Sequence, residues 1–311
     1  MHRLLWLAST HARLLLVAGL VAGLALPGLA AAMVPWLPVM VAGLLTTTAL
    51  RIGHRAAFGA LGDLPRGLLA VLVLQLAVPL LGFAALSLAG LQETPAALAV
   101  ILTSSAPAIT GSVNLALLMR LDAGRMMQIL VLGTAVFPLT VLPILWLVPQ
   151  LGPAGQVVGA ALRLLGVIVL CAGAGFGLRA LLFPRPTEGQ VRALDGLSVL
   201  AFALIVVGLM AALTPALRSD PAAVLRWALL AFAIGWGLQL LALLAVRRGG
   251  AGPVGGLLAL GAGNRNIAIF LVALPPEVLA PLMVFIGCWQ LPMYLTPILL
   301  PRLYAWALRH D

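Results

Sequence analysis

Long apolar runs, separated by arginines and by proline or glycine, dominate the 311-residue chain. A helix needs about 20 mostly apolar residues to cross the hydrocarbon core of a bilayer. Boundaries drawn at the charges and at the Pro/Gly breaks predict an all-α polytopic membrane protein with ten transmembrane helices. The predicted spans lie near 14–33, 35–50, 67–90, 95–119, 124–148, 157–183, 192–214, 224–246, 254–274 and 278–304.

The first apolar run has a second interpretation. Arg3 and Arg13, the run 14–26 and the small residues of 28–32 also resemble a secretory signal peptide. Cleavage there would leave nine helices and would disrupt the two-fold pattern described below. The sequence leaves open whether this segment is ever removed.

Composition and charge narrow the class of protein. Apolar residues make up 63% of the chain and charged residues only 8%, whereas soluble domains have about 45–50% and about 25%. This excludes a soluble enzyme, a disordered chain and a nucleic-acid-binding domain. The net charge of +10 comes from 18 basic residues, all of them arginines. Of these, 14 fall on one side of the predicted spans and two on the other, and the remaining two lie within spans. The positive-inside rule then places both termini in the cytoplasm of a bacterial-type inner membrane.

A sequence motif recurs in the two halves of the chain. Pro138 and Pro143 stand in a P-x-x-x-x-P-I-L motif, and Pro292 and Pro297 stand in another, 154 residues further along. The recurrence predicts two five-helix repeats, 1–153 and 154–311. Because five is odd, the second repeat must insert upside down, which is the inverted topology of many secondary transporters.

Polar residues concentrate where the fourth and ninth predicted helices are broken by proline and glycine. All three asparagines of the chain lie in these two segments, and an amide at mid-membrane depth needs partners. The breaks therefore predict a polar cavity, although hydrogen bonding across a packed helix interface would also explain them. The candidate substrate-binding residues are Thr110, Ser112, Asn114, Asn264, Arg265, Asn266 and Gln290.

Arg265 is an isolated cation in the ninth predicted helix. An unpaired charge at this depth is costly, so we expect a partner: a substrate anion, the carbonyl groups of the broken helices, or water. None of the eight acidic residues and no histidine falls at mid-membrane depth. Acid–base and Ser–His chemistry therefore have no residues to use, and we expect the protein not to be an enzyme.

Four places in the sequence resemble the bile acid:sodium symporter family. They are Gln75 followed by Pro79, the stretch 107–143 with Asn114, the segment 264–266, and the pair Trp289–Gln290. The resemblance implies a panel of helices 1, 2, 6 and 7 and a core of helices 3–5 and 8–10. It also implies that helices 4 and 9 cross at their breaks and that the substrate binds between panel and core.

The sequence departs from this family where the relatives bind two sodium ions. Gly261 stands where the family has a glutamate that serves both sodium ions, and Arg265 stands where it has a glutamine. The fifth-helix positions at which the family has hydroxyl side chains are Met126 and Leu130. A guanidinium close by opposes sodium binding, so sodium as a cofactor is doubtful. Oxygens for one residual sodium ion could still come from Gln75, Ser112, Asn114 and Asn264.

The leading hypothesis is a secondary transporter that moves an organic anion, either steroid-like or a small carboxylate, by alternating access. A transport-inactive membrane scaffold or sensor is a second hypothesis, and an auxin-efflux-like or arsenite-efflux-like carrier is a third. The expected partners are the small anion and the lipid bilayer, with no nucleic acid. The substrate, the direction of transport and the oligomeric state are not determined by the sequence.

Overall fold

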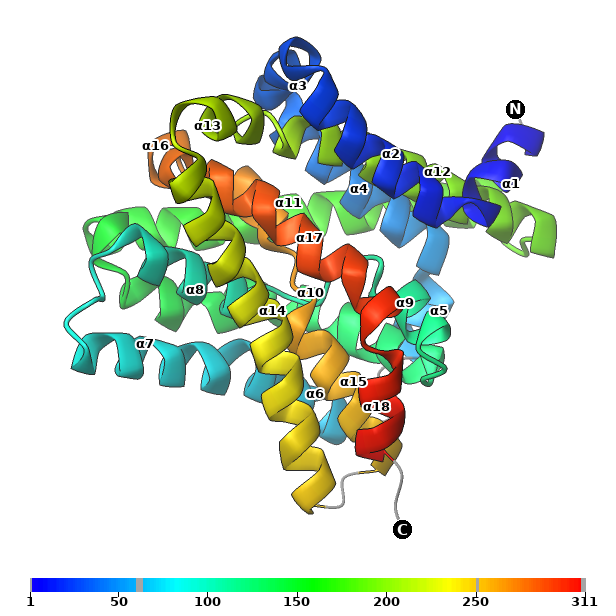
Figure 1. Cartoon of the computed structure of the whole chain (residues 1–311). Coiled ribbons are helices and arrows are strands. Elements are labelled where there is room, and N and C mark those ends of the chain that lie inside the picture. Colours follow the sequence, from blue (N-terminus) through cyan, green and yellow to red (C-terminus); the bar gives the residue numbers. More distant parts are fainter. Residues whose placement is uncertain (1, 60–63, 250–251, 309–311) are drawn as a thin grey trace. The chain divides into compact units, whose positions relative to one another are not determined.

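The computed structural model describes residues 2–59, 64–249 and 252–308. Within these ranges every regular element is helical (Figure 1). The one β-type contact among them is an isolated antiparallel bridge between Ala108 and Arg265. The contacts divide the chain into two compact units, and each unit draws on both halves of the sequence. Unit 1 comprises Met1–Gly59, Arg163–Val224 and Leu271–Gly287, and unit 2 comprises Ala60–Leu162, Leu225–Phe270 and Cys288–Asp311.

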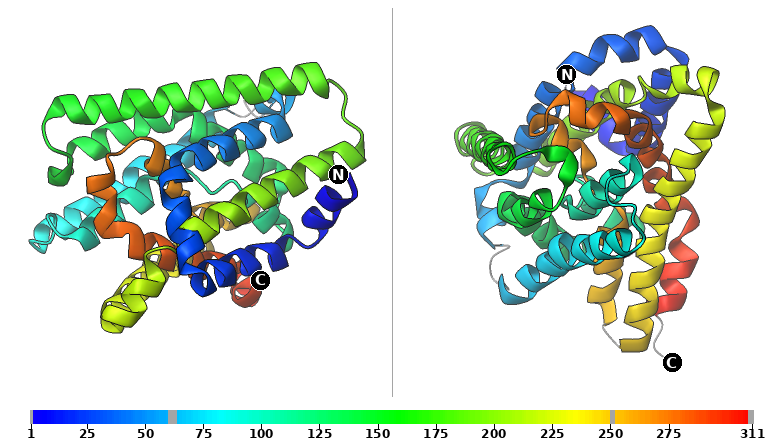
Figure 2. Two further views of the ribbon diagram at one scale, coloured as in Figure 1. Left: turned by 90° about the horizontal axis from the view of Figure 1, so that it is seen from above. Right: turned by 90° about the vertical axis from the view of Figure 1, so that its left-hand side faces the viewer.

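Unit 1 is built around α12, against which the N-terminal helices pack. It also contains most of α11, which is one unbroken helix, drawn in green across the top of the left-hand view of Figure 2. Its elements are α1 (His2–Thr10), α2 (Ala12–Ala25), α3 (Pro27–Met33), η1 (Val34–Trp36), α4 (Leu37–Ile52), α5 (His54–Gly59), α11 (Ala154–Leu182), α12 (Glu188–Leu209), α13 (Leu213–Ser219), α16 (Pro276–Leu279) and η6 (Ala280–Leu282).

Unit 2 contains the two short apolar helices α8 and α15, whose ends meet at the bridge. The other helices of the unit surround them. Its elements are α6 (Leu64–Leu72), the π-helical turn η3 (Val73–Ala77), α7 (Val78–Leu88), α8 (Pro95–Ser105), α9 (Ser112–Leu118), α10 (Ala123–Trp146), η4 (Pro149–Leu151), α14 (Pro221–Gly249), α15 (Gly252–Gly263), η5 (Ile267–Val272), α17 (Met283–Leu299) and α18 (Pro301–Leu308), of which α14, η5 and α17 extend a few residues into unit 1.

The prediction of an all-α polytopic membrane protein is confirmed. Among the described residues, seven helical segments are long and apolar enough to cross a membrane, and an eighth is added if the bent pair α1–α2 forms one span. The short helix α8 falls within the predicted fourth span, and α15 overlaps the predicted ninth span, starting two residues before it. The count of ten spans and the division into two inverted repeats stay predictions. The seven segments are Pro27–Ile52, Leu64–Leu88, Ala123–Trp146, Gly155–Leu182, Glu188–Ser219, Pro221–Gly249 and Pro276–Leu299.

The first two helices do not divide where the sequence analysis put the boundary. We predicted helices at 14–33 and 35–50, but α2 ends at Ala25, and Pro27–Ile52 forms one apolar segment long enough to span. Leu26 leaves the helical conformation, with φ −119° and ψ 66°. Pro27 explains this, because proline disfavours the α conformation of the residue before it and brings no N–H to continue the helix.

Two glycines on one face of α2 allow close contact with α12. A Cβ at Gly19 would lie 2.6 Å from the carbonyl oxygen of Ala203, and a Cβ at Gly23 would lie 2.6 Å from the Cβ of Met210. Their spacing of four residues places both on the same side of the helix. This is the small-residue contact that brings helices together in membranes, where lipid removes most of the hydrophobic driving force.

We therefore predict that Gly19→Ala destabilises the protein by about 1–3 kcal/mol, the usual effect of overpacking. Gly43→Ala in α4 is the matched control, because a Cβ there meets nothing within 4 Å. The measurement is thermal unfolding of the two purified variants in detergent. Equal unfolding temperatures would show that the Gly19 contact is not close in the protein.

Candidate functional site

The break after α8 is set by Pro107. Ala106 caps the helix with φ −58° and ψ 152°, an extended conformation that a following proline favours. Residues 106–110 continue without α-helix until α9 begins at Ser112. The carbonyl groups of this segment are therefore not used by a continuing helix.

The break after α15 pairs with the break after α8. The N–H of Ile109 donates to the carbonyl oxygen of Asn264 at 2.9 Å, and the N–H of Asn266 donates to that of Pro107, also at 2.9 Å. These two hydrogen bonds form the antiparallel bridge between Ala108 and Arg265. The predicted crossing of the two broken helices is thus a short pair of extended peptides, which we call the crossover (residues 106–110 and 264–266).

Arg265 is enclosed at the crossover, with a relative exposure of 1%. Its guanidinium donates to three backbone carbonyl oxygens from three segments: Nε to Ala262 at 3.0 Å, Nη1 to Ala106 at 2.9 Å and Nη2 to Leu74 at 2.9 Å. Within the described ranges no carboxylate pairs with it. Of the three expected partners, the structure therefore provides backbone carbonyl groups, two from the broken helices and one from the π-helical turn.

Ala106 lies at the break after α8, and the other two carbonyl groups are also available for a local reason. The N–H of Val78 donates to Val73 in the π-helical turn, and Pro79 has no N–H, so Leu74 loses both of its possible helical donors. Ala262 loses its usual donor, four residues on, because the N–H of Asn266 donates to Pro107 instead. The irregular backbone of three segments is thus satisfied by one side chain, as buried polar groups in a membrane protein require.

Helix α17 also reaches the crossover. The indole Nε1 of Trp289 donates to the carbonyl oxygen of Arg265 at 3.0 Å. The candidate residue Gln290, which follows it in the chain, has a relative exposure of 2%. The Trp289–Gln290 pair singled out in the sequence therefore lies in the helix that contacts the second break.

Three buried side-chain oxygens near the breaks have no hydrogen-bond partner among the described residues. They are Oγ1 of Thr103, Oγ of Ser112 and Oδ1 of Asn264. The amide nitrogen of Asn264 is used, because it donates to Leu260 at 2.9 Å. An unsatisfied buried polar group costs about 1–3 kcal/mol, so these oxygens mark a place where a ligand, an ion or water would be stabilising.

The other candidates differ in their access to the surface. Thr110 and Asn266 have relative exposures of 8% and 7%, and Asn114, in the first turn of α9, is partly exposed. Ser112, Asn264, Arg265 and Gln290 are buried. The structure thus brings both breaks together, with some candidates enclosed and others at the edge of the site.

Gln75, a candidate sodium ligand, holds two helices together. Its Nε2 donates to the carbonyl oxygen of Gly133 at 3.0 Å, and its Oε1 accepts from the hydroxyl of Thr140 at 2.7 Å. A Cβ at Gly133 would lie 2.8 Å from that Nε2. The amide is therefore employed within the protein, and its role toward sodium stays a prediction.

A second glutamine network was missed by the sequence analysis. In α14, Nε2 of Gln239 donates to the hydroxyl of Thr296 at 3.2 Å, and its Oε1 accepts from Tyr304 at 2.7 Å. Thr296 lies in the second proline motif, as Thr140 lies in the first, although at a different place within it. The signal that could have found Gln239 was a lone amide in a leucine-rich span, since such a group needs partners.

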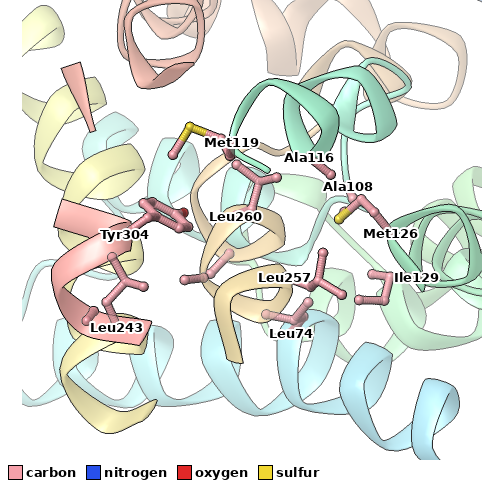
Figure 3. Close-up of a cluster of buried hydrophobic side chains, with 13 residues drawn as sticks. Leu74, Ala108, Ala116, Met119, Met126, Ile129, Leu243, Leu257, Leu260 and Tyr304 are labelled. Atoms are coloured by element: carbon pink, nitrogen blue, oxygen red, sulfur yellow. The ribbon is translucent and has the colours of Figure 1, made fainter. Parts of the chain in front are cut away.

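Apolar side chains occupy the positions that the family resemblance linked to sodium. A Cβ at Gly261 would lie 3.3 Å from Cδ1 of Leu74 and 3.8 Å from Cε of Met126. Figure 3 shows Leu74 and Met126 in a buried cluster with Leu257, Leu260 and Ile129. Leu130 is also buried, with 3% relative exposure. No group of three or more His, Cys, Asp or Glu side chains that could hold a metal ion occurs in the described ranges.

A scan against protein-family models and a search of curated proteins give no match to this chain. The class of protein therefore rests on the fold and the sequence, which define an all-α integral membrane protein with two broken helices that pair at their breaks. The family resemblance and the ligands it implies stay predictions.

We predict that Arg265→Gln destabilises the protein by about 3 kcal/mol or more, because hydrogen bonds to charged groups contribute about 1.5–3 kcal/mol each. A glutamine side chain cannot reach three carbonyl groups that lie in three segments. Arg163→Gln is the matched control, since Arg163 is exposed on α11. Thermal unfolding in detergent compares the two variants. An Arg265→Gln protein as stable as the control would contradict the bonding described here.

Proposed function

We propose that the protein is a secondary transporter of an organic anion that works by alternating access and binds its substrate at the crossover. The observation that carries the proposal is the set of unpartnered buried oxygens of Thr103, Ser112 and Asn264 beside two paired helix breaks. A protein that needed only rigid packing would gain stability from apolar side chains at these positions.

The chemistry of the crossover suits an anion that also bears a hydroxyl group or a bound water. The hydroxyl of Ser112 can donate to a carboxylate or sulfonate oxygen, and Oδ1 of Asn264 can accept from a substrate hydroxyl. Arg265 adds a positive charge in surroundings where charges are poorly screened. This charge acts at short range, while the guanidinium itself stays bonded to the backbone.

The same charge supports transport that is independent of sodium. In the relatives that the sequence resembles, sodium ions supply positive charge behind the crossover. Here a guanidinium occupies the break, and the side chains around Gly261 are apolar. A covalently attached cation cannot be released in each cycle, so the carrier would equilibrate its substrate across the membrane. The membrane we propose is a bacterial-type inner membrane, with both chain termini in the cytoplasm because most arginines lie at that side.

A transport-inactive scaffold or sensor is the second candidate function. The observation that favours it is the bonding of Arg265 to three carbonyl groups, which stabilises one arrangement of the breaks. Transport measured in liposomes separates the two functions. We expect the purified protein in proteoliposomes to exchange a radiolabelled anion from a panel of taurocholate, small carboxylates and sulfonates. No exchange of any of them above empty liposomes would favour the scaffold.

We predict that Asn114→Ala and Asn266→Ala each lower the exchange rate at least about tenfold, the effect of losing a hydrogen bond worth about 1–3 kcal/mol. Both amides lie in or beside the crossover and contribute little to the hydrophobicity needed for insertion. Gln150→Ala is the matched control, because this amide bonds to Gln92 away from the breaks. Rates are compared at equal amounts of inserted protein. Full activity in both asparagine variants would contradict a substrate site at the crossover.

We also predict that replacing sodium by potassium or choline leaves uptake by the unmodified protein unchanged. Uptake into proteoliposomes is measured with and without an inward sodium gradient. Arg265→Gln is expected to lose uptake, and the double change Gly261→Glu with Arg265→Gln is expected to recover it only when sodium is present. Accumulation driven by the sodium gradient in the unmodified protein would show that Arg265 does not replace the ion.

A further inference from the structure

A pocket of about 260 Å³ lies in unit 1, where α4 and α11 end. None of its lining residues belongs to the crossover, whose residues are part of unit 2. Two segments far apart in the sequence form it, one from the turn between α4 and α5 and the other from the end of α11 and the residues after it. Its lining residues are Ile52, Gly53, His54, Arg55, Ala56, Arg179, Pro184, Arg185 and Pro186.

The lining is basic. Three of the nine lining residues are arginines, one is a histidine, and none is acidic. Arg55, Arg179 and Arg185 form no ion pair with any carboxylate of the described residues, whereas Arg51, just before the pocket, is paired with Asp195. Arginines that line one pocket without a carboxylate leave positive charge uncompensated, and a bound anion would compensate it.

The backbone of the pocket holds Arg179 in place. Gly53 ends α4 with φ +74°, a conformation that glycine adopts without strain. A Cβ at Gly53 would lie 3.2 Å from Cγ of Arg179, so the arginine stem packs directly on this turn. Nη1 of Arg179 donates to the carbonyl oxygen of Leu50 at 3.2 Å, which leaves other N–H groups of the fork for a ligand.

Apolar side chains continue from the pocket along α11. Leu178, Leu181 and Leu182 have relative exposures of 41%, 81% and 61% and belong to an apolar membrane-spanning segment. An anion in the pocket would therefore sit at the end of a lipid-facing helix. Phosphate esters are bound well by paired guanidinium groups, and basic pockets at the cytoplasmic ends of transmembrane helices suit anionic lipid headgroups.

We infer that this pocket, lined by Arg55, Arg179 and Arg185, binds a phosphate-bearing anion, with an anionic phospholipid headgroup as its source and the acyl chains along α11. This site does not depend on the transported substrate, because none of the crossover residues lines it. Its occupation would hold the end of α4 against the end of α11 and stabilise unit 1.

The test titrates the purified full-length protein in detergent with phosphatidylglycerol, with phosphatidylcholine and with inorganic phosphate, and follows thermal unfolding. The variant is Arg55→Gln with Arg185→Gln, which removes two pocket charges and keeps the packing of Arg179. The matched control is Arg248→Gln with Arg302→Gln, two exposed arginines that do not line the pocket. We expect stabilisation by phosphatidylglycerol, with an apparent affinity about 10- to 30-fold weaker in the pocket variant and unchanged in the control.

Inorganic phosphate could stabilise the unmodified protein and the control but not the pocket variant. That result would support the site and would identify free phosphate as the bound anion. Two results would overturn the inference. One is an equal loss in the pocket variant and in the control, which would show general attraction to surface charge. The other is equal stabilisation by phosphatidylglycerol and phosphatidylcholine in all three proteins, which would show an effect of lipid without recognition of the anion.

Discussion

The hydrogen bonds from one guanidinium to the backbone of three segments hold the crossover of this protein together. Arg265 donates to Ala262, Ala106 and Leu74, which belong to both broken helices and to the π-helical turn before α7. In a bilayer, carbonyl groups at a helix break have no water to satisfy them. The charge of Arg265 needs acceptors, and the broken helices need a donor. Each therefore satisfies the other, which allows a cation to be buried without a carboxylate.

The same arrangement explains why the backbone irregularities occur together. Pro79 removes the donor that Leu74 would otherwise have, Pro107 directs the chain out of α8, and Asn266 gives its N–H to the other break. A change at one of these places would leave an unsatisfied group at another. The glutamine networks of Gln75 and Gln239 then fix the neighbouring long helices through the hydroxyls of Thr140 and Thr296.

The charge of Arg265 and the apolar cluster beside Gly261 are consistent with each other. Where a removable cation is bound, the protein must supply oxygen ligands and some negative charge. Here the space beside Gly261 is taken by Leu74 and Met126, which supply neither. A fixed cation that uses backbone oxygens needs no acidic ligand, and among the described residues no carboxylate pairs with Arg265. Beside the crossover, the buried side-chain oxygens of Ser112 and Asn264 have no hydrogen-bond partner among the described residues.

The sequence by itself determined the class of protein and the location of its polar residues. Apolar runs and charges report directly on what lipid accepts, so the all-α membrane class and the two breaks followed from local pattern, whereas the count of ten spans stays a prediction. Leu26 shows the limit of that approach, because the apolar run was assigned to one helix although Pro27 ends the helix before it. Only the tertiary structure decided which partner Arg265 has, because its acceptors lie on segments up to 191 residues away. The tertiary structure also decided that Gln75 and Gln239 form hydrogen bonds with Thr140 and Thr296. Such bonds depend on how distant helices pack, and the pattern of a single sequence does not record that packing.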